Sequence, residues 1–243
     1  MNREILEVKE FFNRLASYYD LIYNEQFKEK TKGEITFLQN FLPKKGKILD
    51  IACGTGRHLL PLKMLGYEVI GIDLSKNMLQ IPRNKIKNLK FNIKLIQGDM
   101  RFLPLQNQSI VGVICLFSSF CHLLTLDNQK KTVNEIYRIL KNNGVVIIDV
   151  ANWYWLKKQW QKKGEKIGII PGTQKITVHL ENRYIDNPLR TKLCHYTKED
   201  LRRLFSIFPR VDFYGSFSLN AKFNSQSSRI IMVAKKKQLE YKV

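Results

Sequence analysis

The sequence predicts an α/β protein with a doubly wound, mostly parallel sheet and helices on both faces. Short, almost uniformly apolar segments alternate with helix-compatible ones, as expected for parallel strands buried on both faces. Asp50 and Asp73 lie at or near the ends of the first two such segments, 47–52 and 67–73. Between these segments lies a loop with two glycines. We therefore expect a β-α-β unit whose ligand lies beside the carboxyl edge of the sheet.

Seven segments have the composition of strands. The five that we expect to run parallel are 47–52, 67–73, 92–98, 109–117 and 144–151. Two later segments, 210–217 and 229–235, are separated by a stretch too short for a helical crossover, so we expect them to pair antiparallel. The predicted sheet is therefore seven-stranded with an antiparallel last strand.

Helices are expected before, between and after these strands. Apolar side chains recur at helical spacing over 4–23, and a second helix over 27–41 should end before Pro43. The further helices that we expect are 57–65, 75–81, 127–141 and 197–207.

Individual residues predict where some of these helices begin and end. Pro82 should end or kink the helix that starts at residue 75. Asp127 is a candidate N-cap, and Gly144 should mark the end of that helix. Thr197 followed by Asp200 fits a capping box in its acidic form.

The chain is strongly basic, with 41 Lys and Arg against 21 Asp and Glu and a formal net charge of +20. Such a charge raises the hypothesis of a polyanionic partner such as RNA or an anionic membrane surface. The lysines are spread along the whole chain, however, which favours a solvated basic surface.

The cysteines and the start of the chain bear on metals and location. Cys53, Cys115, Cys121 and Cys194 show no C-x-x-C spacing, so no metal site is expected. Reduced thiols are the default in the cytosol. The chain starts with a charged amphipathic segment rather than an apolar signal core, and its longest apolar run is too short to span a bilayer. We expect a cytoplasmic protein without a membrane partner.

Three ligands could explain the loop Gly54-Thr-Gly56. A dinucleotide site requires a third glycine, and Arg57-His58-Leu59 follows instead. A phosphate-binding P-loop requires Gly-Lys-Ser/Thr, which is absent. S-adenosylmethionine has no phosphate, but it has an amino-acid head for Asp50 and a ribose for Asp73.

Five motifs in order resemble those of the class I S-adenosylmethionine-dependent methyltransferases, a Rossmann-like family. The resemblance covers most of residues 45–151. The motifs are Ile48-Leu-Asp-Ile-Ala-Cys-Gly-Thr-Gly56, Val69-Ile-Gly-Ile-Asp73-Leu-Ser75, Gly98-Asp-Met100, Cys115-Leu-Phe-Ser-Ser-Phe120 and Glu135-Ile-Tyr-Arg-Ile-Leu-Lys-Asn-Asn-Gly144. The resemblance implies S-adenosylmethionine as cofactor and S-adenosylhomocysteine as product.

The resemblance also implies which residues hold the methionine part of the cofactor. Asp50 would meet the ammonium group, and Leu116 would lie near the sulfonium. The loop residues implied to hold the same part are Ala52, Cys53, Gly54 and Gly56. Ala52 departs from the family, which usually has a glycine there. Tyr19 belongs to a Tyr-Tyr-Asp element that many members fold over the cofactor.

Four further residues are implied for the adenosine part. Asp73 would hold the ribose hydroxyls, and Leu74 would flank the adenine. Asp99 would accept from the adenine amino group, and Met100 would donate from its backbone. The acid that often precedes the fourth strand of the family is missing here, which removes one landmark without affecting cofactor binding.

The methyl acceptor is less well defined. Methyl transfer is an in-line displacement, and a base is needed only when the acceptor carries a proton. His122 is the candidate base, with simple packing as the alternative. Asn152, Trp153 and the pair His195-Tyr196 could also border the substrate.

The signatures of base amino-methylation and base C5 methylation are not found after the fourth strand. We expect N- or O-methylation of a small molecule. The alternative is a tRNA or rRNA methyltransferase that uses the basic surface and the aromatic, lysine-rich stretch 153–163. A third possibility is a module that binds the cofactor without turnover. The oligomeric state stays open.

We expect residues 1–243 to form a single methyltransferase domain. Its expected parts are an N-terminal helical cap at 1–42, a cofactor-binding core at 43–151, a substrate-side insertion at 152–196, and a C-terminal helix and strand pair at 197–243. The insertion loses the regular pattern apart from a probable strand over 174–184.

Overall fold

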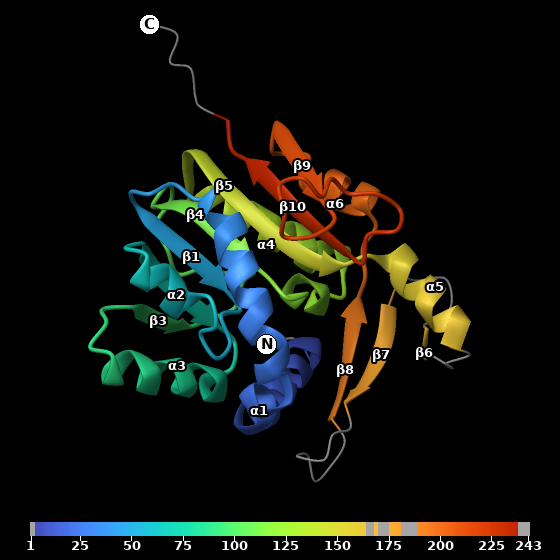
Figure 1. The fold of residues 1–243 in the computed structure, drawn as a ribbon, viewed down its shortest axis with the longest axis horizontal. Coiled ribbons are helices and arrows are strands. Elements are labelled where there is room, and N and C mark those ends of the chain that lie inside the picture. Colours follow the sequence, from blue (N-terminus) through green and yellow to red (C-terminus); the bar gives the residue numbers. More distant parts are fainter. Residues whose placement is uncertain (1–2, 164–167, 170–174, 181–188, 238–243) are drawn as a thin grey trace, which may run out of the picture.

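The computed structural model describes residues 3–163, 168–169, 175–180 and 189–237. In these residues the main sheet has seven strands in the order β3-β2-β1-β4-β5-β10-β9 (Figure 1). The strands are β1 (Lys47–Ile51), β2 (Glu68–Asp73), β3 (Lys94–Gln97), β4 (Ile110–Cys115), β5 (Leu140–Ala151), β9 (Arg210–Tyr214) and β10 (Arg229–Lys235). The last strand, β10, is antiparallel to both neighbours, β5 and β9. The predicted fold class is confirmed.

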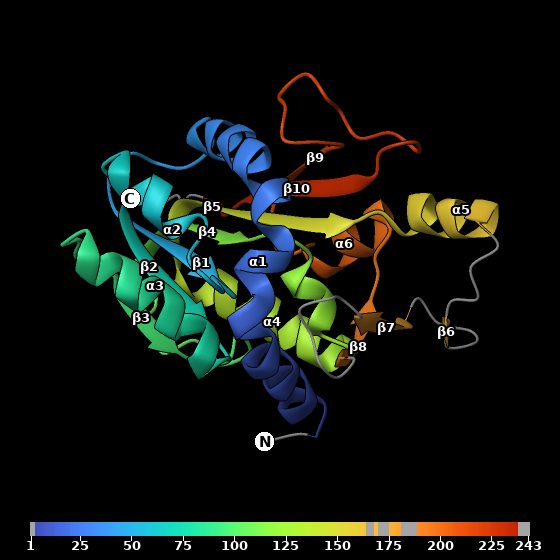
Figure 2. The same ribbon diagram turned by 60° about the horizontal axis from the view of Figure 1, so that its bottom comes forward.

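Helices cover both faces of this sheet (Figure 2). They are α1 (Arg3–Gln39), α2 (Leu59–Met64), α3 (Lys76–Asn88), the 3-10 turn η1 (Ser119–His122), α4 (Leu126–Ile139), α5 (Trp153–Lys163) and α6 (Lys198–Leu204). The C-terminal half of α1 packs with α2 and α3 on one face. On the opposite face, α4 and α6 pack together with η1. Over the described ranges, no helix has the length and apolar character needed to cross a membrane.

The central strand β1 explains why the strands read as continuous apolar runs. Successive side chains of a strand point to opposite faces. Leu49 and Ile51 accordingly belong to the core beneath α4 and α6, whereas Ile48 belongs to the core beneath α1, α2 and α3. Because both faces are buried, the positions after the exposed Lys47 select apolar residues, except for Asp50 near the carboxyl edge.

The predicted pair of N-terminal helices is wrong, because α1 is one continuous helix of 37 residues. The segment expected to separate them, 24–26, contains neither glycine nor proline, so nothing in it opposes helix continuation. The helix ends at Gln39, before Pro43, as the proline predicts.

Three predicted helix boundaries also need correction. Thr125, not Asp127, caps α4, since its side chain accepts a hydrogen bond from the backbone N of Asn128. Gly144 lies inside β5, because α4 ends earlier and the chain passes directly into the strand. The helix α3 continues through Pro82. The capping box at Thr197 is confirmed.

A small second sheet follows α5, a helix that the sequence did not predict. Its strands are β6 (Gly168–Ile169), β7 (Lys175–Leu180) and β8 (Leu189–Cys194), paired antiparallel. The predicted strand over 174–184 corresponds to β7, and its last part, 181–184, lies outside the described residues. Leu189 of β8 is buried against Phe11 and Leu15 of α1. The strand β8 therefore packs on the helix that borders the site.

Candidate functional site

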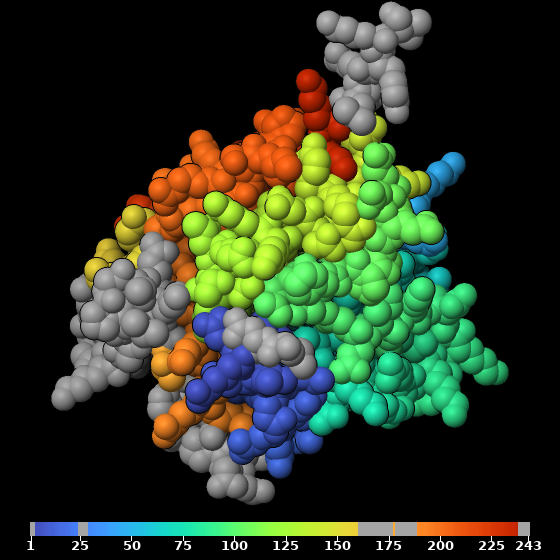
Figure 3. Space-filling model, turned by 180° about the vertical axis from the view of Figure 1, so that it is seen from behind, coloured from blue at the N-terminus to red at the C-terminus, as the bar shows by residue number. Residues whose placement is uncertain are grey.

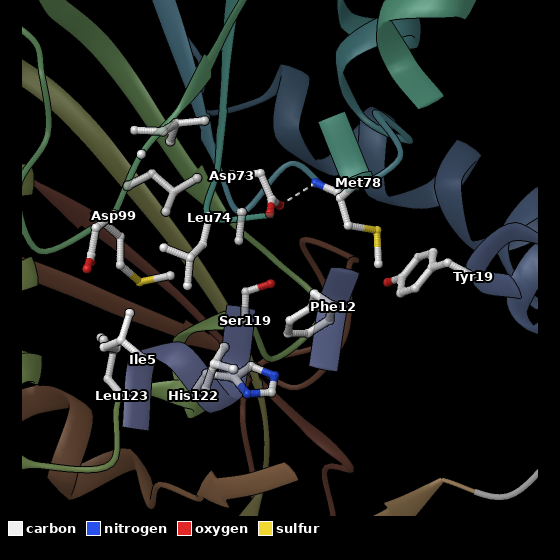
Figure 4. A pocket seen from close by; sticks show the side chains of 17 residues that line it. Ile5, Phe12, Tyr19, Asp73, Leu74, Met78, Asp99, Ser119, His122 and Leu123 are labelled. Atoms are coloured by element: carbon white, nitrogen blue, oxygen red, sulfur yellow. Dashed lines mark hydrogen bonds between the residues drawn. The ribbon is translucent and has the colours of Figure 1, made fainter. Parts of the chain in front are cut away.

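A pocket lies at the carboxyl edge of the sheet, under the N-terminal half of α1. We call this part the apolar end. Figure 4 shows Ile5 and Phe12 of α1 beside Leu74, Ser119 and His122. The residues that line it are Ile5, Val8, Phe12, Tyr19, Ile51, Ala52, Gly54, Ile72, Asp73, Leu74, Met78, Gly98, Asp99, Met100, Ser119, His122 and Leu123. Figure 3 shows the start of α1 (dark blue) at the molecular surface below α4 (yellow-green).

A second pocket, which we call the charged end, adjoins the first. The two share Tyr19, Ala52, Gly54 and Ser119 in their walls. The residues that line the charged end are Tyr19, Asp50, Ala52, Cys53, Gly54, Thr55, Arg57, His58, Leu116, Phe117 and Ser119. The shared walls make the two ends parts of one elongated site along the glycine loop.

The glycine loop has left-handed backbone at three positions. Ala52, Gly54 and Gly56 have φ values of 55°, 54° and 80°. Ala52 adopts this conformation although it carries a side chain, which is a strained arrangement typical of functional loops. A Cβ on Gly56 would lie 2.7 Å from Cβ of Pro82, so α3 can pack here only against a glycine. Gly56 lines neither end of the site and instead supports the loop.

The carboxylate of Asp73 is fixed at the end of β2. Its Oδ2 accepts a hydrogen bond of 2.8 Å from the backbone N of Gly54, and its Oδ1 accepts one of 2.8 Å from Ser75. Burial raises the pKa of Asp73 to about 6, although these hydrogen bonds oppose the shift. The carboxylate therefore faces the apolar end in a fixed orientation and is largely ionised at neutral pH.

Asp50 is the most unusual polar group of the site. It is 2% exposed, and its Oδ2 has no hydrogen-bond partner among the described residues. Burial raises the pKa of Asp50 to about 8, while the charge of Arg57 opposes the rise. A buried carboxyl without a partner is destabilising unless a donor or cation meets it. The charged end is therefore suited to an ammonium group.

Asp99 lies at the far side of the apolar end and is held by a neighbour. Nε of Arg101 donates to both carboxylate oxygens at 3.0 and 3.1 Å, and Nη2 donates at 2.6 Å. Nη1 of Arg101 donates in turn to Asn128 of α4 at 3.0 Å. Arg101 and Asn128 were not identified from sequence, because neither belongs to a recognised motif. Together they fix the side chain that borders the pocket beside Met100.

His122 borders the apolar end from η1. Its ring is 4.9 Å from that of Phe12 in an edge-to-face arrangement, and its Nδ1 lacks a hydrogen-bond partner in the part of the chain described. Burial, followed by the charge of His195, lowers the pKa of His122 to about 4. The imidazole is thus neutral at physiological pH, and its proton affinity is lower than that of an exposed histidine. The hydroxyl of Tyr196 lies 3.4 Å from the carbonyl oxygens of both Phe120 and Leu123, so its one proton is shared between the two ends of this turn.

The chain after β4 has a strained path that leads to this turn. Phe117 and Ser118 both have left-handed backbone, with φ values of 55° and 61°. Oδ2 of Asp149 on β5 accepts from the backbone N of Phe117 at 2.9 Å, and Arg229 on β10 forms an ion pair with that carboxylate at 2.7 Å. Leu116, just before the strained residues, is held against the charged end. No local motif predicted this support, because its partners lie on distant strands.

Residues of α1 reach both ends of the site. Tyr19 lies where the ends meet, and burial followed by the charge of Tyr23 raises its pKa well above the usual value. Further along α1, Glu34 accepts hydrogen bonds from Arg57 and from Nε2 of His58, the latter at 2.9 Å. Burial opposes ionisation, but these partners hold the pKa of Glu34 below its usual value. Sequence reasoning missed this cluster.

The structure brings the predicted cofactor residues together, except that Gly56 supports the loop from behind. The predicted substrate residues fall into two groups, one inside the site and one outside it. His122 lies in the site, whereas His195 and Tyr196 line a separate cavity between α4 and α6. Trp153 is buried and stacks on His195, with ring centres 5.9 Å apart. Asn152 is fully buried and donates to the carbonyl of Ser227. Within the described ranges, no three His, Cys, Asp or Glu residues are grouped as metal ligands.

Comparison with known proteins identifies the matching part of the chain. The profile of the methyltransferase domain family matches residues 48–144. The chain is 33% identical to an uncharacterized protein of Methanocaldococcus jannaschii over 64% of this chain and 56% of that protein. It is 32% identical to a glycine/sarcosine N-methyltransferase of Parasynechococcus marenigrum over 60% of this chain and 52% of the relative. The chain thus matches about half the length of these curated relatives.

Among solved structures, an S-adenosylmethionine-dependent methyltransferase from Clostridium acetobutylicum superimposes with a TM-score of 0.73 at 20% identity. The superposition covers 93% of this chain and 99% of that structure. At this identity the likeness shows the shared fold, and the domain match supplies the family. Residues 48–144 of this chain thus belong to the methyltransferase domain family, and the chain has the fold of class I methyltransferases.

Proposed function

We propose that this chain transfers a methyl group from S-adenosylmethionine to a nitrogen or oxygen atom of a small molecule. The observation that carries the proposal is the buried carboxyl of Asp50, whose Oδ2 meets no partner in the described residues. It lies at one end of an elongated site that has the fixed carboxylate of Asp73 in its other part. A ligand with a cationic head and a sugar fits this arrangement.

The residues around the charged end would hold the amino-acid part of the cofactor. Asp50 would meet its ammonium group, while the backbone of the loop from Ala52 to Gly54, including Cys53, would approach it closely. Leu116 would lie near the sulfonium, and Tyr19 would cover the junction between the ends. Gly56 would contribute by letting the loop pack on α3.

The residues around the apolar end would hold the adenosine part. Asp73, already oriented by two backbone donors, has the remaining oxygen lone pairs to accept from ribose hydroxyls. Leu74 would flank the adenine ring, and Asp99 would accept from its amino group. Met100 would donate from its backbone.

The chemistry requires little of the protein beyond positioning. S-adenosylmethionine supplies a methyl group that is already activated by the positive sulfonium, for in-line displacement by the acceptor. The chain would align the acceptor and exclude water, as the apolar wall from α1 favours. His122, neutral at physiological pH, would accept the proton of an N–H or O–H acceptor.

A small acceptor is favoured over RNA by two considerations. Three curated relatives bear the name glycine/sarcosine N-methyltransferase, from Parasynechococcus marenigrum, Halorhodospira halochloris and Aphanothece halophytica, and this name gives small amines as their acceptors. In the stretch proposed to stack RNA bases, Trp153 is only 8% exposed and packs on His195. Trp160 lies outside the residues whose side chains are described. The basic surface keeps RNA as the second candidate.

The test is methyl transfer from labelled S-adenosylmethionine by the purified chain to a cell extract, which is then fractionated into RNA, protein and small molecules. The proposal predicts label in the small-molecule fraction. Label in RNA, with binding that weakens steeply with salt, would support the second candidate instead. Cofactor binding without label in any fraction would indicate a binding module. Asp73→Asn is the control that should abolish most of the incorporation.

A further inference from the structure

A guanidinium and a carboxylate both border the charged end of the site. Arg57 follows the glycine loop, and its side chain is 13% exposed. Its charge reaches Asp50, since it opposes the upward pKa shift that burial produces there. The charged end therefore brings a guanidinium and a titratable carboxyl together in one small pocket.

The guanidinium is held by two residues of α1, outside the pocket, and by one aromatic ring of the pocket wall. Nη1 of Arg57 donates to Oγ1 of Thr31 at 3.0 Å and to the carboxylate of Glu34, both on α1. The guanidinium carbon also lies 5.7 Å from the ring centre of Phe117, in a cation–π arrangement. An arginine fixed on two sides loses little further freedom when it binds a ligand.

A purely structural role for Arg57 would be to connect α1 to the glycine loop. Glu34 already makes this connection through a second hydrogen bond, to Nε2 of His58. The side chain of His58 is 8% exposed, so that bond is buried and does not involve Arg57. The connection between α1 and the glycine loop therefore does not depend on Arg57 alone, so its position beside the pocket needs another explanation.

The explanation comes from the charges of an amino acid. The methionine part of the proposed cofactor has an ammonium and a carboxylate on the same carbon, so its site should offer one group of each sign. Asp50 suits the ammonium. The planar guanidinium of Arg57 suits the carboxylate, because its N–H groups match two carboxylate oxygens.

We propose that Arg57 binds the carboxylate of the amino-acid part of S-adenosylmethionine and that Glu34 is the positioning residue which aims it. The proposal rests on the proposed function, since it assumes that this cofactor occupies the site. It adds a binding residue directly after the glycine loop to those proposed above.

The test compares two ligands that differ only in the carboxylate, S-adenosylmethionine and decarboxylated S-adenosylmethionine, by titration calorimetry. The wild-type protein should bind the complete cofactor about 10- to 100-fold more tightly. Arg57→Met should bring this ratio to within about threefold of one while the affinity for the decarboxylated ligand stays within about threefold of wild type. Glu34→Gln should reduce the ratio by an intermediate factor, about three- to tenfold.

A matched control removes a guanidinium elsewhere. Arg83 is exposed on α3, and Arg83→Met should leave the ratio unchanged. An equal loss of affinity for both ligands in Arg57→Met would overturn the proposal, since Arg57 would then only support the loop. A wild-type protein that does not distinguish the two ligands would overturn it without any variant. If the wild type bound neither ligand, the proposed function itself would fail.

Discussion

The apolar end of the site is walled by Ile5, Val8 and Phe12 from one helix, whereas the charged end is bordered by Asp50 and Arg57 from the core of the fold. Affinity at the apolar end should follow the area buried. Affinity at the charged end should follow pH and the identity of the charged groups. A ligand that occupies both ends would therefore show two separable contributions, and ligands that lack one part can measure each.

Substitution of His122 should leave both contributions to ligand affinity unchanged and yet cause the largest change of all, a loss of kcat. His122→Asn should lower kcat by about 100-fold or more, because a general base contributes about 10²–10⁴-fold. The dissociation constant of S-adenosylhomocysteine should stay within about threefold. Steady-state kinetics on the identified acceptor and calorimetry provide the two measurements. A normal kcat would show that His122 only packs against Phe12.

Substitution of Asp73 should affect both ends of the site, because its carboxylate accepts a hydrogen bond from the loop that both ends share. Asp73→Asn should weaken S-adenosylhomocysteine and methylthioadenosine alike, by about 10- to 100-fold, since both contain the ribose. Asp127→Asn, a change of an exposed acid on α4, should alter neither affinity. A loss confined to S-adenosylhomocysteine would contradict the ribose role.

The protonation of Asp50 should make ligand affinity at the charged end depend on pH, which separates it from the apolar end. Its pKa of about 8 means that it is mostly protonated at pH 6, whereas an ammonium ligand requires the ionised form. The affinity for S-adenosylhomocysteine should therefore rise between pH 6 and 8, by up to about tenfold per unit. Asp50→Asn should remove this dependence between pH 7 and 8 and weaken binding at pH 8 by about tenfold. Methylthioadenosine, which lacks the amino-acid part, should show no such rise between pH 7 and 8.

The same group makes a prediction for stability without ligand. The folded pKa of Asp50 lies above the ordinary value of 3.8, so the folded protein holds this proton more tightly than the unfolded chain. The stabilisation is complete below about pH 4 and is lost as the pH rises to about 8. Asp50→Asn should therefore flatten the decline in free energy of unfolding over this range, as urea denaturation at several pH values would measure. An unchanged slope would mean that the carboxyl is solvated in solution.

Phe12 should give the smallest effect, confined to the apolar end. Phe12→Ala should weaken S-adenosylhomocysteine and methylthioadenosine equally, by about three- to tenfold, because part of one aromatic face is lost. The effect should not vary with pH. The exposed Phe102, 63% accessible, supplies the control substitution Phe102→Ala. Unequal losses for the two ligands would show that Phe12 also serves the charged end.

Much of the fold followed from local patterns. The buried strand before the glycine loop was predictable because both of its faces require apolar side chains, and Asp50 interrupts it where the edge begins. The capping box at Thr197 was predictable because its two partners lie three residues apart. Thr125 was missed because Asp127, two residues later, is an equally good N-cap by residue type alone.

Contacts between distant segments could not be predicted in the same way. Glu34 lies 23 residues before Arg57, and only the path of α1 across the sheet brings them together. The support of Phe117 by Asp149 likewise depends on the pairing of neighbouring strands. Pro82 was expected to interrupt α3, yet it packs against Gly56 within a continuous helix. The sequence motifs thus located the groups that face a ligand, whereas the groups that hold them came from tertiary structure.

The uninterrupted α1 has a mechanical consequence. A helix of 37 residues is about 55 Å long, so the wall of the apolar end and the hydrogen bonds between Glu34 and the residues after the glycine loop belong to a single helix. Tilting one extremity of a rod displaces the other. Deletion of the residues before Tyr19 should therefore remove the α1 wall and expose the apolar end to solvent, while the hydrogen bonds of Glu34 remain.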